Sequence, residues 1–177
     1  LYPNDFGAYN NLGELAFAAG DAAKAESYFK QAASKNANAP EVNANLGLCE
    51  LVKGNVAAAE SYLGKATGAN AANEALGNLY IKQGQYDRAV NAFGDAKTNS
   101  AAQAQILAKD YNKAKATLSA IKNPDAMTDY LMAIVGARTN NASLVSSSIK
   151  SAIAKDASMA QRAANDREFA KFADSIK

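Results

Sequence analysis

The chain has 177 residues, of which 49% are hydrophobic, a formal net charge of +2 and no histidine. So small a charge excludes the basic surface that nucleic-acid binding requires, and the lack of histidine removes the commonest general base and the usual zinc ligand. Alanine dominates the hydrophobic residues and favours helices. No apolar run approaches the roughly 20 residues of a membrane span.

The first helical pattern begins after Asp5, which we expect to cap it, and ends at Gly20. A glycine just past a periodic segment is typical of a left-handed helix end. Asp21 follows and is a good cap for a second helical pattern, "AAKAESYFKQA". The sequence therefore predicts two helices joined by a tight turn at Gly20 and Asp21.

This two-helix pattern recurs further along the chain. The second copy lies 34 residues later and the third a further 30 residues on. The repeated positions hold Leu-Gly, then Gly, Ala and a large apolar residue: Leu12-Gly13, Gly20, Ala25 and Phe29; Leu46-Gly47, Gly54, Ala59 and Leu63; Leu76-Gly77, Gly84, Ala89 and Phe93. Asn55 and Gln85 take the place of Asp21, and we expect Asn55 to cap its helix.

The first glycine of each copy, at 13, 47 and 77, lies inside a helix, where glycine costs about 1 kcal/mol relative to alanine. Three occurrences at one register predict that a neighbouring helix approaches too closely for a Cβ atom. Alanine fills the matching small position on the second helix. We expect the large residues Phe29, Leu63 and Phe93 to fill the space between repeat units as core.

The period weakens after residue 97, but helical patterns continue. We expect a short helix at 100–108 capped by Ser100, which nine residues make about 13 Å long, and its partner at 110–121. A helix over 124–138 should carry Pro124 in its first turn, with Met132, Ala133 and Gly136 facing inward. Its partner over 142–155 should face inward through Leu144, Val145, Ile149 and Ala152.

The final segment, 157–177, has sparser apolar residues and is predicted to cap the array, because a solenoid needs an end unit with a polar outer face. Asn165-Asp166 should break it into two short helices. Four apolar residues are expected to cover the last repeat: Met159, Ala163, Phe169 and Phe172. Five charged residues are expected to face water: Arg162, Asp166, Arg167, Glu168 and Lys171.

The Leu-Gly, Gly, Ala and Phe positions, together with Tyr80 and Tyr86 in the third copy, resemble the tetratricopeptide repeat. The resemblance covers residues 1–97 well and the rest loosely. It implies one all-α domain over 1–177, a right-handed superhelical solenoid of antiparallel helix pairs with a C-terminal capping segment. The expected units are 6–39, 40–69, 70–98, 99–122 and 124–156. Pro3 would be the terminal proline of a preceding unit, so we expect a fragment or processed product of a longer chain; a natural N-terminal linker is the alternative.

The resemblance also implies a binding function for the wall formed by the first helix of each pair, called helix A. This wall is expected to bind a protein or peptide without chemistry. The residues that we expect to contact the partner are Asn10, Glu14, Phe17, Ala44, Leu48, Leu51, Glu74, Asn78 and Ile81. The two carboxylates predict a neutral or basic partner segment.

The family's carboxylate clamp for chaperone C-termini would need basic residues and asparagines at Asn10, Glu14, Asn45, Ala71 and Ala75. Only Asn45 fits, and Glu14 would repel a terminal carboxylate, so we do not expect this clamp. No catalytic constellation, metal-ligand set or phosphate-binding loop occurs in the sequence, and we expect no catalytic residue, metal or cofactor. Cys49, in an apolar helical setting, is expected to be a buried structural thiol.

The alternative function is a structural spacer or assembly platform within a larger bacterial envelope protein. The alanine- and asparagine-rich composition and the segment "DAMTDYLMAIVGARTNN" look like the repeat regions of such proteins. This texture favours a periplasmic or envelope-associated location and leaves a cytoplasmic one open.

Overall fold

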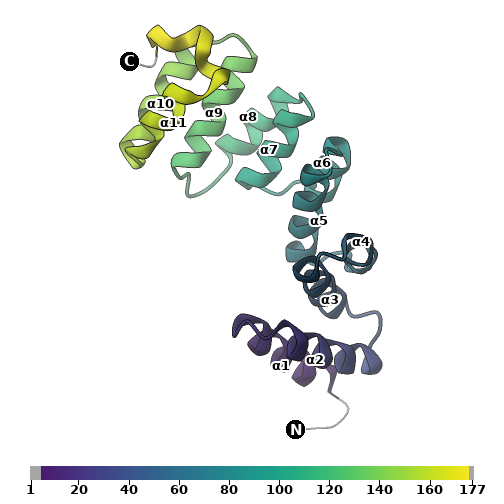
Figure 1. Cartoon of the computed structure of the whole chain (residues 1–177). Coiled ribbons are helices and arrows are strands. Elements are labelled where there is room, and N and C mark those ends of the chain that lie inside the picture. Colours follow the sequence, from purple (N-terminus) through teal and green to yellow (C-terminus); the bar gives the residue numbers. More distant parts are fainter. Residues whose placement is uncertain (1–4, 176–177) are drawn as a thin grey trace. The chain divides into compact units, whose positions relative to one another are not determined.

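The structure, a computed structural model, describes residues 5–175 (Figure 1). These residues form eleven α-helices and one 3-10 helix and contain no strand. The chain is therefore an all-α helical repeat solenoid, as predicted. Pro3, on which the expectation of a preceding unit rests, lies outside the described residues.

The chain divides after Leu79 into two compact units, and each is described by itself. We call residues up to Leu79 unit 1 and residues from Tyr80 unit 2. The predicted single domain of five repeat units and a cap stays a prediction, as does the right-handed superhelix.

Unit 1 consists of two complete helix pairs and most of a fifth helix. Its helices are α1 (Phe6–Ala18), α2 (Ala22–Lys35), α3 (Pro40–Lys53), α4 (Val56–Lys65) and α5 (Asn70–Lys82), the last of which continues into unit 2. The closest packing is within the pairs α1–α2 and α3–α4, and α2 also packs against α3. Short connections make the paired helices antiparallel neighbours.

Unit 2 carries the remaining helices. They are α6 (Tyr86–Phe93), α7 (Asn99–Leu107), α8 (Tyr111–Ser119), α9 (Ala126–Arg138), α10 (Ala142–Lys155), α11 (Ser158–Asn165) and the 3-10 helix η1 (Arg167–Ser175). The pairs α7–α8 and α9–α10 pack closely, and α11 and η1 both lie against α10. The segment predicted to cap the array therefore does form two short helices that break at Asn165 and Asp166.

The predicted turns are confirmed, with one exception among the caps. Gly20, Gly54 and Gly84 have φ angles of +83°, +80° and +72°, the left-handed conformation expected just past a helix. The Asp21 carboxylate accepts a hydrogen bond from the Lys24 amide at 3.0 Å. The Asn55 side chain does not cap α4; its Nδ2 donates to Glu50 Oε2 at 2.7 Å.

Two predicted helix starts were wrong by one or two residues. α7 begins at Asn99, and its cap is Thr98, whose hydroxyl accepts from the Ala101 amide, rather than Ser100. α9 begins at Ala126, after Pro124, because Asp125 forms a capping box with Thr128. In both cases a better capping residue lies next to the predicted start.

The small and large positions of the repeat meet as the sequence predicts. A Cβ atom built on Gly13 would lie 2.4 Å from the Phe29 ring, and one on Gly47 would lie 2.6 Å from Leu63 Cγ. Phe29 thus packs between the two helices of its own pair. It also belongs to a cluster that includes Val42 and Leu46 of the next pair, so it is not a plug between units alone. Its equivalents Leu63 and Phe93 are buried too, as are the alanines at 25, 59 and 89.

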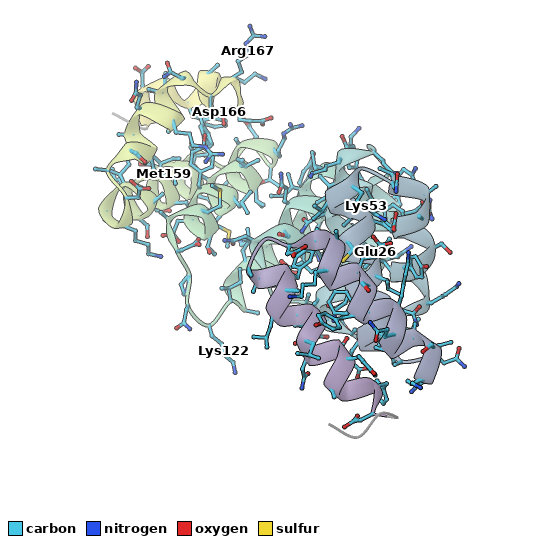
Figure 2. All side chains as sticks on the ribbon, turned by 60° about the horizontal axis from the view of Figure 1, so that its bottom comes forward. Glu26, Lys53, Lys122, Met159, Asp166 and Arg167 are labelled. Carbon is cyan, nitrogen blue, oxygen red and sulfur yellow. The ribbon has the colours of Figure 1, made fainter. Side chains whose placement is uncertain are left out.

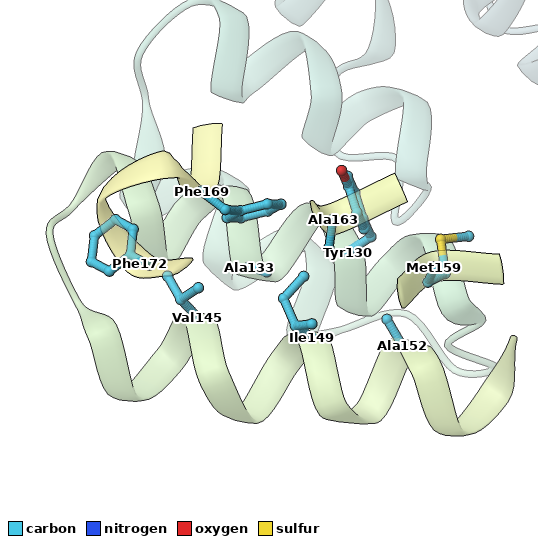
Figure 3. Close-up of a cluster of buried hydrophobic side chains, with 9 residues drawn as sticks. All are labelled: Tyr130, Ala133, Val145, Ile149, Ala152, Met159, Ala163, Phe169 and Phe172. Carbon is cyan, nitrogen blue, oxygen red and sulfur yellow. The ribbon is translucent and has the colours of Figure 1, made fainter. Parts of the chain in front are cut away.

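The apolar residues of the capping segment cover the last helix pair, as predicted (Figure 3). Met159, Ala163, Phe169 and Phe172 are all buried in one cluster with α9 and α10 residues. The Phe169 ring meets Tyr130 edge to face, with 5.5 Å between ring centroids. This packing holds α11 and η1 against the helix pair.

The prediction that all charged residues of the cap face water was wrong for Asp166 and Glu168, which are half-buried. Asp166 Oδ2 accepts a hydrogen bond from the Tyr130 hydroxyl at 2.6 Å. Glu168 Oε2 accepts from Arg138 Nε at 2.7 Å, and its Oε1 pairs with the other end of that guanidinium. These carboxylates anchor the cap because α9 presents donors to them.

Within residues 5–175, none of the helices combines the length and the apolar character that crossing a membrane requires.

Candidate binding surface

Three polar side chains of α1 and α3 form one hydrogen-bonded group in unit 1. Asn10 Nδ2 donates to Glu14 Oε1 at 2.7 Å, one helical turn away. Asn45 Nδ2 donates to Asn10 Oδ1 at 3.0 Å and to Glu14 Oε1 at 3.2 Å. The group links the helix A of one pair to the helix A of the next.

Glu14 is the exposed member of this group, whereas Asn10 is buried and Asn45 is half-buried. Both amides converge on Oε1, and Oε2 accepts no hydrogen bond from the described residues. The carboxylate is therefore held in one orientation with a free oxygen on the surface. Preorganised charge of this kind binds with little loss of side-chain entropy.

The apolar residues expected on the same wall differ in how far they are exposed. Leu48 and Leu51 of α3 are half-buried, and Leu51 packs on a cluster formed by Leu63, Ala66 and Ala72. Ala44 belongs to that cluster and is only 4% exposed, so it offers no surface to a partner. We therefore leave Ala44 out of the binding surface; its neighbours on α4 and α5 cover it.

The remaining expected residues lie on α1 and α5. Phe17 is half-buried and packs against the cluster around Phe29. Glu74 is exposed and Asn78 is half-buried, both in unit 1. Ile81 is half-buried and lies on the part of α5 that belongs to unit 2.

We call the accessible residues of this set in unit 1, together with Asn45, the unit 1 surface. It comprises Glu14, Phe17, Asn45, Leu48, Leu51, Glu74 and Asn78. From the sequence, Asn45 was named only as a position of the carboxylate clamp and not as a residue of the binding wall. Its hydrogen bond to Asn10 joins residues that are 35 positions apart in the sequence. The only indication of this contact in the sequence is the repeat spacing of about 34 residues.

A second polar network joins α2 to α3 in unit 1. Glu26 pairs with Lys53 at 3.1 Å (both are labelled in Figure 2) and with Lys30 at 2.7 Å. Lys53 also pairs with Glu50 at 2.5 Å. Hydrogen bonds from these lysines lower the pKa of both glutamates, and the glutamates raise the pKa of Lys30 and Lys53. The charges neutralise one another, so this network holds the helices together and offers little net charge to a ligand.

Cys49 is only 1% exposed, and burial raises the pKa of its thiol to about 11, with smaller contributions from Glu26 and Glu50. A thiol in this state is neither a nucleophile nor a metal ligand at neutral pH. The residues that the structure describes include no group of three or more Cys, Asp or Glu side chains able to hold a metal ion.

Part of the chain matches a known protein family in sequence. Two family models described as tetratricopeptide repeat match residues 16–80 and 71–101. No curated protein sequence matches the chain significantly.

Solved structures share the fold at low sequence identity. A tetratricopeptide repeat protein from Parabacteroides merdae superimposes with a TM-score of 0.74 at 17% identity, covering 97% of this chain and 76% of that one. PilW, described as a type IV pilus biogenesis factor, gives 0.67 at 20% identity, covering 96% and 83%. YrrB, described as a tetratricopeptide repeat protein with an unusual peptide-binding site, gives 0.69 at 18% identity, covering 92% and 93%. The family matches over residues 16–101 identify tetratricopeptide repeats in this chain, and the solved structures show that it has the fold of tetratricopeptide repeat proteins.

Proposed function

We propose that the chain is a non-enzymatic scaffold whose unit 1 surface binds an extended segment or a helix of a partner protein. The observation that carries the proposal is the exposed Glu14 carboxylate, which Asn10 and Asn45 hold in a fixed orientation. Tetratricopeptide repeats generally act as protein-interaction scaffolds, and YrrB, a protein of this fold, is described as having a peptide-binding site.

The apolar part of the surface would supply most of the affinity. Leu48 and Leu51 are half-buried, so each keeps some apolar area to lose to a partner. Phe17 and, in unit 2, Ile81 are expected to contribute in the same way. Affinity should be modest and spread along the helices, because rigid repeats present a preformed, extended surface.

The polar part of the surface would select the partner. Glu14 and Glu74 are both exposed, which favours a neutral or basic segment over an acidic one. Asn45 already donates to Glu14, and this carboxylate would repel a peptide's terminal carboxylate. These contacts support our expectation that the surface is not a clamp for C-terminal carboxylates.

An assembly role is the alternative, and exposed apolar side chains favour it. Leu15 is 68% exposed and Val52 is 63% exposed, on α1 and α3 of unit 1. In this case the chain would be a spacer or assembly platform of a bacterial envelope protein. PilW, a protein of this fold, is described as a factor for type IV pilus biogenesis. We accordingly propose a periplasmic or envelope-associated location, with the cytoplasm as the alternative.

The test is affinity capture with the wild-type chain and with the double variant Glu14→Lys, Glu74→Lys. A matched control, Asp87→Lys, Asp95→Lys, changes the charge equally at exposed residues of unit 2. We expect the first variant to lose partners that the wild type and the control both retain, with binding that weakens as salt rises. If all three recover the same partners with the same salt dependence, the unit 1 surface is not the binding site.

A further inference from the structure

Unit 2 contains a cavity of about 400 Å³ that the unit 1 surface does not include. α7 and α9 form its apolar wall through Ile106, Leu107, Met127, Leu131 and Ile134. Arg162 of α11 and Glu168 of η1 also line it, so the capping segment completes the site. Its volume lies within the range of ~300–1,000 Å³ that is typical of ligand pockets.

The charged residues of this cavity are not balanced. Arg138 is already paired with Glu168. Arg162 is exposed, and its guanidinium stacks 4.7 Å from the centre of the Tyr130 ring. Arg162 forms no ion pair with the carboxylates of the described residues; it contacts Tyr130, whose hydroxyl donates to Asp166 Oδ2 at 2.6 Å. One positive charge therefore remains available beside the apolar wall.

We propose that this cavity binds an extended protein segment through one bulky aliphatic side chain and an acidic side chain two residues further along. Side chains at i and i+2 of an extended chain point to the same side, about 6.6 Å apart. The aliphatic group would fill the space between α7 and α9. The carboxylate would pair with Arg162, whose planar fork suits two parallel hydrogen bonds.

This inference is independent of the function proposed for the unit 1 surface. That surface exposes carboxylates and favours a neutral or basic segment, whereas the unit 2 cavity presents an arginine and favours an acidic one. The two sites would therefore recognise different segments.

The direct test uses short peptides with an acetylated N-terminus and an amidated C-terminus, so that neither end is charged. One carries Leu-Ser-Glu, and its two controls carry Leu-Ser-Gln and Ala-Ser-Glu. Titration followed by NMR amide shifts should give binding of Leu-Ser-Glu that is about threefold to fivefold tighter than binding of either control, as expected for an exposed ion pair and a partly buried aliphatic group. The shifts should map to α7, α9 and α11.

Variants of the chain test whether Arg162 is the residue that selects the peptide carboxylate. Arg162→Gln should bind the Glu and Gln peptides equally, while Arg162→Lys should keep part of the preference. Arg167→Gln is the matched control, because Arg167 is exposed, lies on the same capping segment and projects away from the molecule (Figure 2). It should bind as the wild type does. The variant Glu14→Lys, Glu74→Lys should also bind these peptides normally, which separates this site from the unit 1 surface.

Several results would overturn the proposal. Equal binding of the Glu and Gln peptides by the wild type would show that Arg162 does not select a carboxylate, and this comparison needs no variant. If a Leu-Ser-Gln peptide with a free C-terminal carboxylate bound more tightly than the capped Leu-Ser-Glu peptide, Arg162 would recognise a chain terminus and not an acidic side chain. Shifts confined to unit 1 would place binding elsewhere.

Discussion

Gly13 lies directly beneath the ring of Phe29, so close that a Cβ atom on residue 13 would approach ring atom Cε1 to 2.4 Å. Gly47 stands in the same relation to Leu63 in the next helix pair, with a separation of 2.6 Å from Cγ. The glycine thus sets how near the two helices of a pair can come, and the large residue fills the space that it leaves.

Replacing Gly13 by alanine should therefore destabilise unit 1, although alanine is the better helix former. The added methyl group forces the Phe29 ring to move, and overpacking of this kind costs about 1–3 kcal/mol. Gly64→Ala is the matched control, because no atom lies within 4 Å of the new Cβ there, and it should stabilise by up to about 1 kcal/mol. Urea unfolding followed by circular dichroism measures both; a stabilised Gly13→Ala would show that the close approach is not maintained in solution.

The third repeat should behave in the same way. Phe93 is buried, and Phe93→Ala should cost about 3–5 kcal/mol through the cavity that it leaves. Gly77→Leu should also destabilise strongly by overpacking, because Gly77 is buried at the register of Gly13 and Gly47. The measurement is thermal unfolding of each variant beside the wild type. Melting within a degree or two of the wild type would mean that the assigned register is wrong.

Stability should fall in acid and change little between about pH 6 and 8. Ion pairs with lysines hold the pKa of Glu26 and Glu50 below its ordinary value, and hydrogen bonds from Thr128 do the same for Asp125. The unfolded chain therefore binds protons first as pH falls, and the stabilisation is lost from about pH 5 downward, through the lowered native pKa values. No histidine titrates in the neutral range.

The check is the melting temperature measured from pH 3 to pH 8. Asp125→Asn removes one of the three carboxylates and should lose less stability between pH 5 and pH 3 than the wild type does. A melting temperature that stays constant down to pH 3 would contradict the assignment of these contacts.

The Cys49 thiol should be unreactive in the folded protein. It is buried and its pKa is raised to about 11, so almost no thiolate is present or accessible at pH 8. A thiol reagent such as dithiobis(nitrobenzoic acid) should react fully only after unfolding in urea. Rapid reaction of the native chain would show that α3 opens or that the thiol is exposed.

Local patterns in the sequence determined most of the secondary structure. The spacing of Leu, Gly, Ala and Phe marks helix pairs because each pair must bury the same face at the same register. The turns at Gly20, Gly54 and Gly84 follow from a backbone conformation that glycine adopts without strain. The start of α9 was predicted two residues too early, at Pro124, because the capping box between Asp125 and Thr128 determines where this helix begins.

The tertiary structure decided which side chains are available. Ala44 and Asn10 have the spacing of wall residues, yet both are buried, because the exposure of a residue depends on the neighbouring helices and not on its own helix. Asp166 and Glu168 look like solvated charges until α9 brings Tyr130 and Arg138 against them. The unit 2 cavity combines residues from 99 to 168, and no local pattern in the sequence predicts that Arg162 and Leu131 line the same cavity. Periodicity fixes the face of a helix, whereas contacts between distant segments fix what that face meets.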